Sequence, residues 1–302
     1  MQSGVFKTIV STIFALIAFA ANSVFCRLAL GEQTIDAASF TIIRLLSGSL
    51  ILFVLIVLSQ RLTPRQVEIR GQSKENSNGS WLSGVMLFVY ALSFSFAYIT
   101  LDTATGALIL FGSVQITMIL LSVVAGNRLH KIEWFGMVVA FGGFVYLILP
   151  GVSAPSFSGF ILMTVSGIAW GVYTLRGRGS RKPMRDTAYN FIRTIPLLFV
   201  VFLLVLTQIN YTLEGVVLAI LSGAVASGLG YTIWYMALGG LSATQAAVLQ
   251  LLVPVIAAAG GVIFVSEALT WRLVFSAFLI LSGILFVIIG RYYAMQSVTR
   301  LN

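Results

Sequence analysis

Two arginines stand inside apolar runs of this 302-residue sequence. Arg44 lies in FTIIRLLSGSLILFVL, and Arg193 lies in YNFIRTIPLLFVVFLL. An arginine is permanently charged, and its guanidinium carries N–H bonds that suit carboxylate and phosphate oxygens. In an apolar segment, such a group faces a cavity, a partner or the interface with water. The two runs therefore predict a site for a carboxylate or phosphate if both arginines face a cavity, and a gate or a structural tie if they pair with nearby acidic residues.

Arg44 has three interpretations, all of which stay open from the sequence. Its side chain reaches out to the lipid headgroups, since arginine can extend from an apolar segment to the interface. Alternatively, it pairs with Glu32 or Asp36 in the short polar segment that precedes its run. In the third interpretation, it faces a central cavity and binds an anionic group of a substrate.

Three amide side chains also lie within apolar runs, namely Asn22, Gln115 and Gln250. Polar groups at that depth require partners, because an unsatisfied amide in hydrocarbon is costly. We expect these amides either to tie helices together or to orient a polar solute on a translocation path.

Aromatic side chains on the same runs are predicted to line a cavity for amphipathic solutes. Trp170 and Tyr173 are three residues apart, so they share one face of a helix. Tyr98 lies near the end of its run and is instead expected at the membrane interface. The predicted cavity-lining residues are Tyr90, Trp170, Tyr173, Tyr231 and Trp234.

Acidic residues do not occur deep inside the apolar runs, so the sequence shows no buried proton relay. Asp102 and Glu267 lie at the ends of runs and are predicted to act in gating or coupling. The single histidine, His130, and the single cysteine, Cys26, offer no nucleophile-and-base pair, no metal-ligand spacing and no internal disulfide. The sequence therefore predicts a protein that is not an enzyme and that uses no metal or cofactor.

The elements that position these residues are predicted to be transmembrane helices. The chain is 59% hydrophobic and 9% charged, and its mean hydropathy of +1.01 is typical of an integral membrane protein. Ten continuous apolar runs are long enough to cross a core of about 30 Å as helices, so the predicted fold class is all-α. The predicted spans are Thr8 to Phe25, Ala37 to Ser59, Trp81 to Leu101, Thr103 to Gly126, Trp134 to Val152, Phe157 to Leu175, Thr187 to Gln208, Gly215 to Leu238, Ser242 to Ser266 and Leu273 to Gly290.

The basic residues are concentrated between alternate pairs of runs. With a cytoplasmic N-terminus, most of the 18 Lys and Arg fall on the cytoplasmic side, and only Arg27 and Arg272 fall on the external side. This distribution follows the positive-inside rule and predicts that both termini are cytoplasmic. It also accounts for the net charge of +9 without nucleic acid. The expected partners are the lipid bilayer and a small-molecule substrate, with monomer and homodimer both open.

The two halves of the chain show an internal repeat. Arg27 and Arg44 align with Arg176 and Arg193 at one common offset, and a shorter offset aligns the later runs of each half. Because five helices per repeat is an odd number, the second repeat would enter the membrane from the opposite side. The repeat also argues against reading the first run as a cleavable signal peptide, which its apolar composition otherwise resembles. The predicted domains are residues 1–152 and 153–302.

Two segments of the second half resemble a known family. AWGVYTLRGR begins at Ala169, and ASGLGYTIWYMALGGLSATQAAVLQLLVPVIAAAGGVIFVSEALT begins at Ala226. These residues resemble the EamA-type transporters of the drug/metabolite transporter superfamily, and the resemblance extends over all ten runs. The first half departs from the family pattern, since Asn22 replaces a glycine and Asn127 replaces a glutamate.

The resemblance implies a carrier in the inner membrane of a bacterium. Its central cavity would be walled by helices of both halves, and its cargo would be amino acids or related amphipathic metabolites. Export by alternating access would be its mode of action. The alternative is a non-transport membrane protein, a channel or a scaffold, in which the arginines serve as structural ties.

Overall fold

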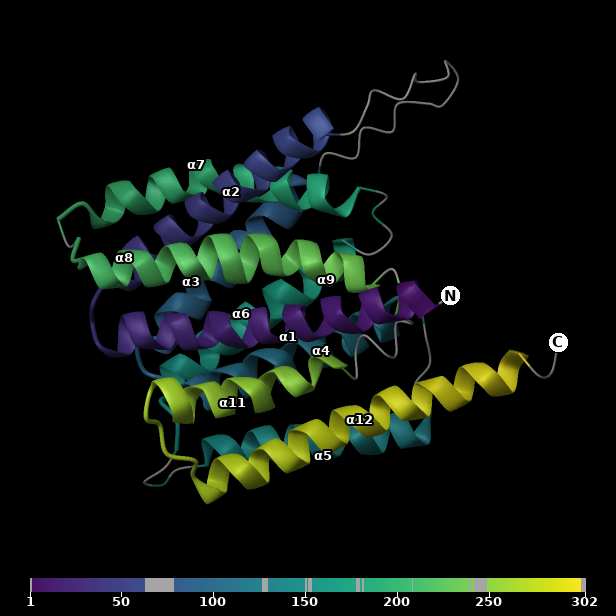
Figure 1. Cartoon of the computed structure of the whole chain (residues 1–302). Helices are drawn as coiled ribbons and strands as arrows, with labels where there is room; N and C mark the ends of the chain where they lie inside the picture. Colours follow the sequence, from purple (N-terminus) through teal and green to yellow (C-terminus); the bar gives the residue numbers. More distant parts are fainter. Residues whose placement is uncertain are drawn as a thin grey trace, which may run out of the picture.

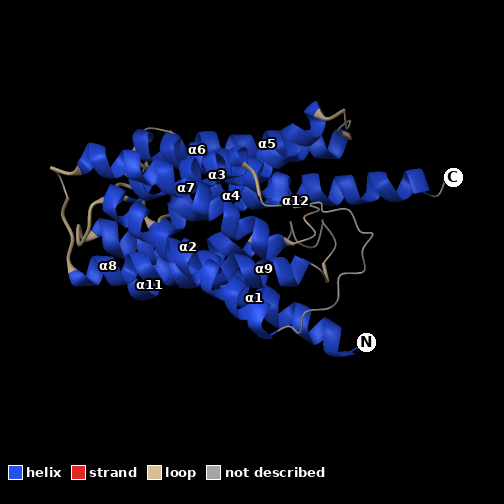
Figure 2. Ribbon diagram, turned by 90° about the horizontal axis from the view of Figure 1, so that it is seen from above, coloured by secondary structure: helices blue, strands red, loops and turns tan. Residues whose placement is uncertain are grey.

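The computed structural model describes residues 2–62, 79–126, 130–149, 151, 154–177, 180, 182–207, 209–238, 240–241 and 249–299. Within these residues almost all of the chain is helical, as Figure 2 shows in blue, and one isolated bridge is the only β-type pairing. The predicted all-α fold class is confirmed. The elements are α1 (Gln2–Gly31), α2 (Ala37–Leu62), α3 (Trp81–Tyr98), α4 (Thr103–Val124), α5 (Lys131–Ile148), α6 (Phe157–Gly177), α7 (Pro183–Val205), α8 (Leu213–Ile220), η1 (Leu221–Leu229), α9 (Gly230–Leu238), α11 (Leu252–Phe264) and α12 (Trp271–Thr299).

Nine helical segments in the described part of the chain are long and apolar enough to cross a membrane. One of them runs without a break through α8, η1 and α9, and η1 is a π-helix. α11 is a further apolar helix of 13 residues, which makes it about 20 Å long. It covers the later part of the predicted span Ser242 to Ser266, whose residues 242–248 lie outside the described residues.

Polar side chains begin several helices, because their oxygens accept the N–H groups that a first turn leaves unpaired. Asp36 accepts the N–H of Ser39 at 2.8 Å and so begins α2. Ser80 and Thr212 accept in the same way at the starts of α3 and α8. Each of these caps pairs one backbone N–H that the first turn would otherwise leave without a partner.

α1 begins and α12 ends at the same end of the bundle, on the right of Figure 1. We call this the terminal end, and we call the opposite end, where α1 finishes, the Arg27 end. An even number of crossings places both termini on one side, as the ten predicted spans require. α1 packs against η1, α9 and α11. α1 therefore packs within the helical bundle.

The packing partners of the helices follow the order of the predicted repeat. α1 packs against η1, α9 and α11, and its predicted equivalent α6 packs against α3 and α4. α2 packs against α7, and α5 packs against α12, which Figure 1 shows side by side along one edge. Exchanging the two halves leaves most of these pairings in place, as a two-fold axis in the membrane plane would. The repeat boundaries themselves stay a prediction.

Glycines let α2 and η1 approach closely at the centre of the bundle. A Cβ atom at Gly223 would overlap the backbone oxygen of Arg44. A Cβ atom at Gly228 would come within 2.5 Å of the side chain of Ile51. The small residues of η1 therefore serve close packing, and they bring the backbone of Arg44 against the second half of the chain.

We expect Gly223→Ala to lower the free energy of unfolding by about 1–3 kcal/mol, because the added methyl group has no room against α2. The matched control is Gly142→Ala in α5, where a Cβ atom meets nothing within 4 Å and helix propensity favours alanine. Thermal unfolding in detergent, followed by reaction of a thiol-specific dye with the single, buried Cys26, measures both variants. Equal unfolding midpoints for the two would contradict the close crossing of α2 and η1.

Candidate functional site

Arg44 lies about two turns into α2 and is almost fully buried, with an exposed fraction of 1%. It does not reach the lipid headgroups, so that interpretation is wrong. The proposed pairing with Glu32 or Asp36 is also wrong. Asp36 accepts the N–H groups of Ser39 and Asn210, and Glu32 is exposed. Both acids stay in the loop at the Arg27 end, whereas the Arg44 guanidinium turns into the bundle.

A network of hydrogen bonds joins Arg44 to three other helical elements. Nη2 of Arg44 donates to Tyr90 Oη at 2.9 Å and to Ser227 Oγ at 3.5 Å. Asn22 Nδ2 donates to the same Tyr90 oxygen at 3.3 Å, and Asn22 Oδ1 accepts from Ser222 Oγ. We call Asn22, Arg44, Tyr90, Ser222 and Ser227 the Arg44 network. It links α1, α2 and α3 of the first half to η1 of the second half.

The wide turn of η1 brings two serines to this network. Ser222 and Ser227 are five residues apart, and in an α-helix they would point about 140° away from each other. A π-helix is bonded from residue i to residue i+5, so residues at this spacing lie nearly above one another. Gly223 and Gly228 repeat the same spacing and face α2. One uniform helix was predicted from the sequence over Gly215 to Leu238. The Ser-Gly pair that recurs after five residues is the sequence signal for the π-helix, and that prediction did not use it.

Part of the Arg44 guanidinium has no hydrogen-bond partner. Nη2 is bonded to Tyr90 and Ser227, whereas Nε and Nη1 are buried and lack acceptors. The guanidinium carbon lies 4.7 Å from the ring centre of Phe94 and 5.2 Å from that of Tyr90, so aromatic faces provide some electrostatic stabilisation. Within the described residues, no carboxylate forms an ion pair with Arg44, and both ion pairs belong to Arg27.

An aromatic cluster surrounds the Arg44 network. The ring centre of Trp170 lies 4.7 Å from that of Tyr90 and 4.8 Å from that of Tyr231. Tyr173 stacks on Trp170 at 5.3 Å, as their spacing on one helix face predicts. Trp234 joins the cluster through an edge contact with a phenylalanine of α1. The structure thus brings all five predicted aromatic residues together.

A cavity of about 10 Å³ lies inside this cluster. A space of that size holds at most about one water molecule, so the site is closed in this conformation. A solute has to separate the walls in order to enter. The lining residues are Phe19, Asn22, Tyr90, Phe94, Leu110, Phe111, Trp170 and Tyr231.

Gln115, Gln250 and Arg193 are predicted path residues that belong neither to the cavity lining nor to the Arg44 network or the aromatic cluster. Gln115 and Gln250 are buried. Arg193 is partly exposed, and its guanidinium carbon lies 5.8 Å from the ring centre of Trp81, the first residue of α3. The two arginines that the repeat aligns therefore differ in their surroundings, with Arg44 at the centre and Arg193 near the terminal end.

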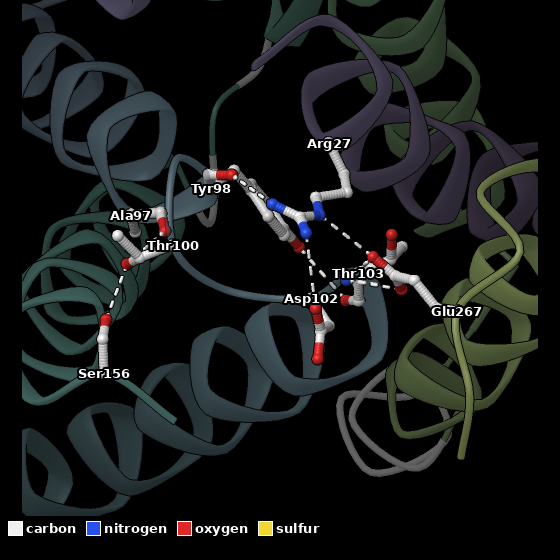
Figure 3. A network of polar contacts seen from close by, with 8 residues as sticks. All are labelled: Arg27, Ala97, Tyr98, Thr100, Asp102, Thr103, Ser156 and Glu267. Atoms are coloured by element: carbon white, nitrogen blue, oxygen red, sulfur yellow. Dashed lines mark hydrogen bonds and ion pairs between the residues drawn. The ribbon is translucent and has the colours of Figure 1, made fainter. Parts of the chain in front are cut away.

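A second set of polar contacts, the Arg27 network, closes the Arg27 end (Figure 3). Nε of Arg27 pairs with Glu267 Oε1 at 3.1 Å, and Nη2 pairs with Asp102 Oδ1 at 3.4 Å. Nη1 of Arg27 donates to the backbone oxygen of Tyr98 at 3.2 Å. Tyr98 is fully buried, so it is not part of a lipid-facing aromatic belt. A pocket of about 200 Å³ opens beside the two acids of this network.

Glu267 also caps α4 from a distant part of the chain. Its two carboxylate oxygens accept the N–H of Thr103, the first residue of α4, at 2.8 and 3.0 Å. A negative charge is stabilising there, because the N-terminus of a helix carries a partial positive charge. Gly261 leaves room, since a Cβ atom at that position would come within 2.5 Å of Glu267 Oε2. The contact ties α4 to the loop between α11 and α12.

Arg27 is the site residue that sequence reasoning missed. In the sequence analysis, Arg27 was used only to assign the orientation of the chain in the membrane and as the repeat equivalent of Arg176. The available signal was its exception to the charge distribution, since an external arginine stood on the same side as Asp102 and Glu267. Within the described residues, no three His, Cys, Asp or Glu side chains come together as a metal site requires.

Long apolar helices around a closed, mostly aromatic centre are the architecture of a multi-pass membrane protein. The family model described as the EamA-like transporter family matches residues 157–289. The chain is 44% identical to uncharacterized protein PA1977 of Pseudomonas aeruginosa, over 94% of this chain and 96% of that protein. It is 31% identical to an uncharacterized transporter of Archaeoglobus fulgidus, over 59% of this chain and 63% of that protein.

A solved crystal structure shares the fold, with a TM-score of 0.61 and 17% identity over 90% of this chain and 94% of that one. The chain belongs to the EamA-like transporter family. It is a multi-pass membrane transporter of the drug/metabolite type. The family match falls in the second half, where the sequence keeps the family pattern most closely.

We expect Arg27 and Glu267 to be energetically coupled, by about 1–3 kcal/mol in a double-mutant cycle of alanine variants. The Glu267 side chain is only 10% exposed, so its charge is little screened. Asp102 is 59% exposed, so its coupling to Arg27 should stay below about 0.5–1 kcal/mol. Unfolding of the single and double variants in detergent measures both couplings. A coupling to Asp102 as large as that to Glu267 would show that the network does not depend on the buried pair.

Proposed function

We propose that this transporter carries small metabolites, amino acids or related amphipathic solutes, by alternating access around the Arg44 network. The observation that supports this most directly is the composition of the site. The Arg44 network and the aromatic cluster draw on helices of both predicted halves, so a relative movement of the halves would open and close them. Export is the direction that we propose.

Contacts join the predicted halves at both ends of the described bundle in this conformation. At the Arg27 end, the Arg27 network is joined by a bridge between Ile35 and Tyr211. At the terminal end, Asp186 accepts the N–H of Gly79 at 3.0 Å, and a neighbouring asparagine of α7 accepts the N–H of Ser80 at 2.9 Å. A carrier with a central site needs such a closed state between its two open ones.

The proposed location is the inner membrane of a bacterium, with both termini in the cytoplasm. The distribution of basic residues supports this orientation, and α1 and α12 end on one side of the bundle (Figure 1). In this orientation the Arg27 network is external, and the contacts of Asp186 are cytoplasmic.

The alternative is a membrane protein, a channel or a scaffold, in which the arginines only stabilise the fold. The position of Arg193 near the surface favours that role for Arg193. The position of Arg44 does not, because a structural tie would be expected to have all of its donors paired.

A reversible lock at the Arg27 end tests the carrier. Ile35 and Tyr211 face each other across an antiparallel bridge, where Cα atoms are about 4.5–5.5 Å apart and a disulfide can form. In a Cys26→Ser background, Ile35→Cys with Tyr211→Cys should stop the flux of a transported solute under oxidising conditions and restore it on reduction. Proteoliposomes and a panel of amino acids and amphipathic metabolites provide the measurement.

Each single cysteine variant is the control, since neither forms the internal disulfide. Flux that continues through the locked protein would mean that the Arg27 end does not open. Absence of flux for every solute, in protein that is folded and unlocked, would favour the channel or scaffold alternative.

A further inference from the structure

Two nitrogens of the Arg44 guanidinium can donate hydrogen bonds that no acceptor in the described chain receives. Nε and Nη1 together carry three of the five guanidinium N–H bonds, and both nitrogens are buried without an acceptor. A buried donor without a partner is costly, and an unpaired buried charge costs more. Tyr90 and Ser227 are neutral acceptors. They satisfy one nitrogen but do not neutralise the charge.

The acidic residues that could neutralise Arg44 have other partners at the ends of the bundle. Asp36 caps α2, and Asp186 accepts a backbone N–H ahead of α3. Asp102 and Glu267 belong to the Arg27 network. An anion that meets Arg44 at the centre therefore has to be a ligand rather than one of these side chains.

The surroundings of Arg44 indicate what kind of anion fits. Tyr231 lines the cavity, and its hydroxyl is a second buried group without a partner. The remaining walls are mostly aromatic, with Trp170 in contact with Tyr231. Arg44 is the one cation that the aromatic cluster contacts among the described residues. One cation, one hydroxyl and aromatic walls complement a single carboxylate on an apolar body.

Access to the guanidinium requires Tyr90 and Phe94 to move. Both rings contact the guanidinium and line the cavity, whereas Arg44 itself is not one of the lining residues. Tyr90 also holds the closed arrangement, because its hydroxyl accepts from Arg44 and Asn22. A carboxylate oxygen at the guanidinium would be a stronger acceptor than this phenol. Entry of the anion would therefore exchange a neutral contact for a charged one.

We propose that the central site binds an organic monocarboxylate, with its anionic group on Arg44 and its apolar body among the aromatic rings. This inference rests on the proposed function, since it names the chemical class of the solute that the proposed central site would bind. It narrows the cargo from amphipathic solutes in general to anions with one carboxylate.

Three probes of one size and shape test the assignment on the unaltered protein. They are 3-phenylpropanoate, 3-phenylpropanamide and 3-phenylpropylamine, which present a carboxylate, a neutral amide and a cation. A ligand that binds the folded state raises the unfolding midpoint. In detergent, with unfolding read from dye reaction at Cys26, we expect the carboxylate alone to raise the midpoint. Equal effects of the amide or the amine would overturn the proposal.

Variants assign the effect to the guanidinium. Arg44→Gln should weaken carboxylate binding at least about tenfold, because it removes the charge from the pair. Arg44→Lys, which keeps a charge but offers fewer donors, should bind with intermediate affinity. The control is Arg185→Gln, which removes a cation that lies over Tyr189 on α7. Parental affinity in Arg44→Gln would sink the assignment, and if that variant does not fold, the probe series above still decides.

Transport separates this inference from the proposed function. If amines or neutral solutes move through proteoliposomes while carboxylates neither bind nor move, the carrier stands and the carboxylate site falls. If carboxylates bind through Arg44 but no solute moves, the binding site stands and the carrier falls. Inorganic phosphate, tested in the same way, should not raise the midpoint, and an effect equal to that of the carboxylate would point to a general oxyanion site.

Discussion

The structure depends on holding the positive charge of Arg44 inside an apolar bundle. A guanidinium at that depth is costly unless its surroundings stabilise it. Hydroxyls from α3 and η1 and the rings of Tyr90 and Phe94 do part of this. To reach a hydroxyl of η1, α2 has to lie directly against that element, which is why Gly223 meets the Arg44 backbone. The close crossing, the π-helix and the aromatic cluster are thus linked by one buried charge.

Arg44, buried at the centre, and Arg27, partly buried at the Arg27 end, have different kinds of partner. Arg27 has two carboxylates and a backbone oxygen as partners, so its pairing holds helix ends together. Arg44 has only neutral partners, so it keeps the capacity to bind a further group. The asymmetry is also visible in the sequence, since the predicted repeat places Asn127 where the second half has Glu267. Among the residues that the structure describes, the ion pair with a largely buried carboxylate lies at the Arg27 end.

The helices could be predicted from the sequence because the membrane fixes the length of an apolar run. Local spacing was also informative, since Trp170 and Tyr173 stack as residues three apart can. Equivalent positions in a repeat were less informative about neighbours, because Arg44 meets a π-helix whereas Arg193 meets an exposed tryptophan. The cap that Glu267 places on α4 joins residues far apart in the chain. Such a contact leaves no local pattern, so the Arg27 network could not be derived from spacing or composition.

The π-helical turns of η1 also make it a joint within a single transmembrane helix. A change of one turn from π-helical to α-helical bonding would rotate everything that follows about the helix axis. The part that follows is α9, which carries Tyr231 and Trp234, while α8 stays tied to the Arg27 end through the bridge at Tyr211. The two ends of this helix can therefore differ in rotational phase. The serines and glycines of η1 contact the Arg44 network and α2. They therefore fix the rotation of α9 about its axis, and with it the position of the α9 aromatic side chains relative to Arg44.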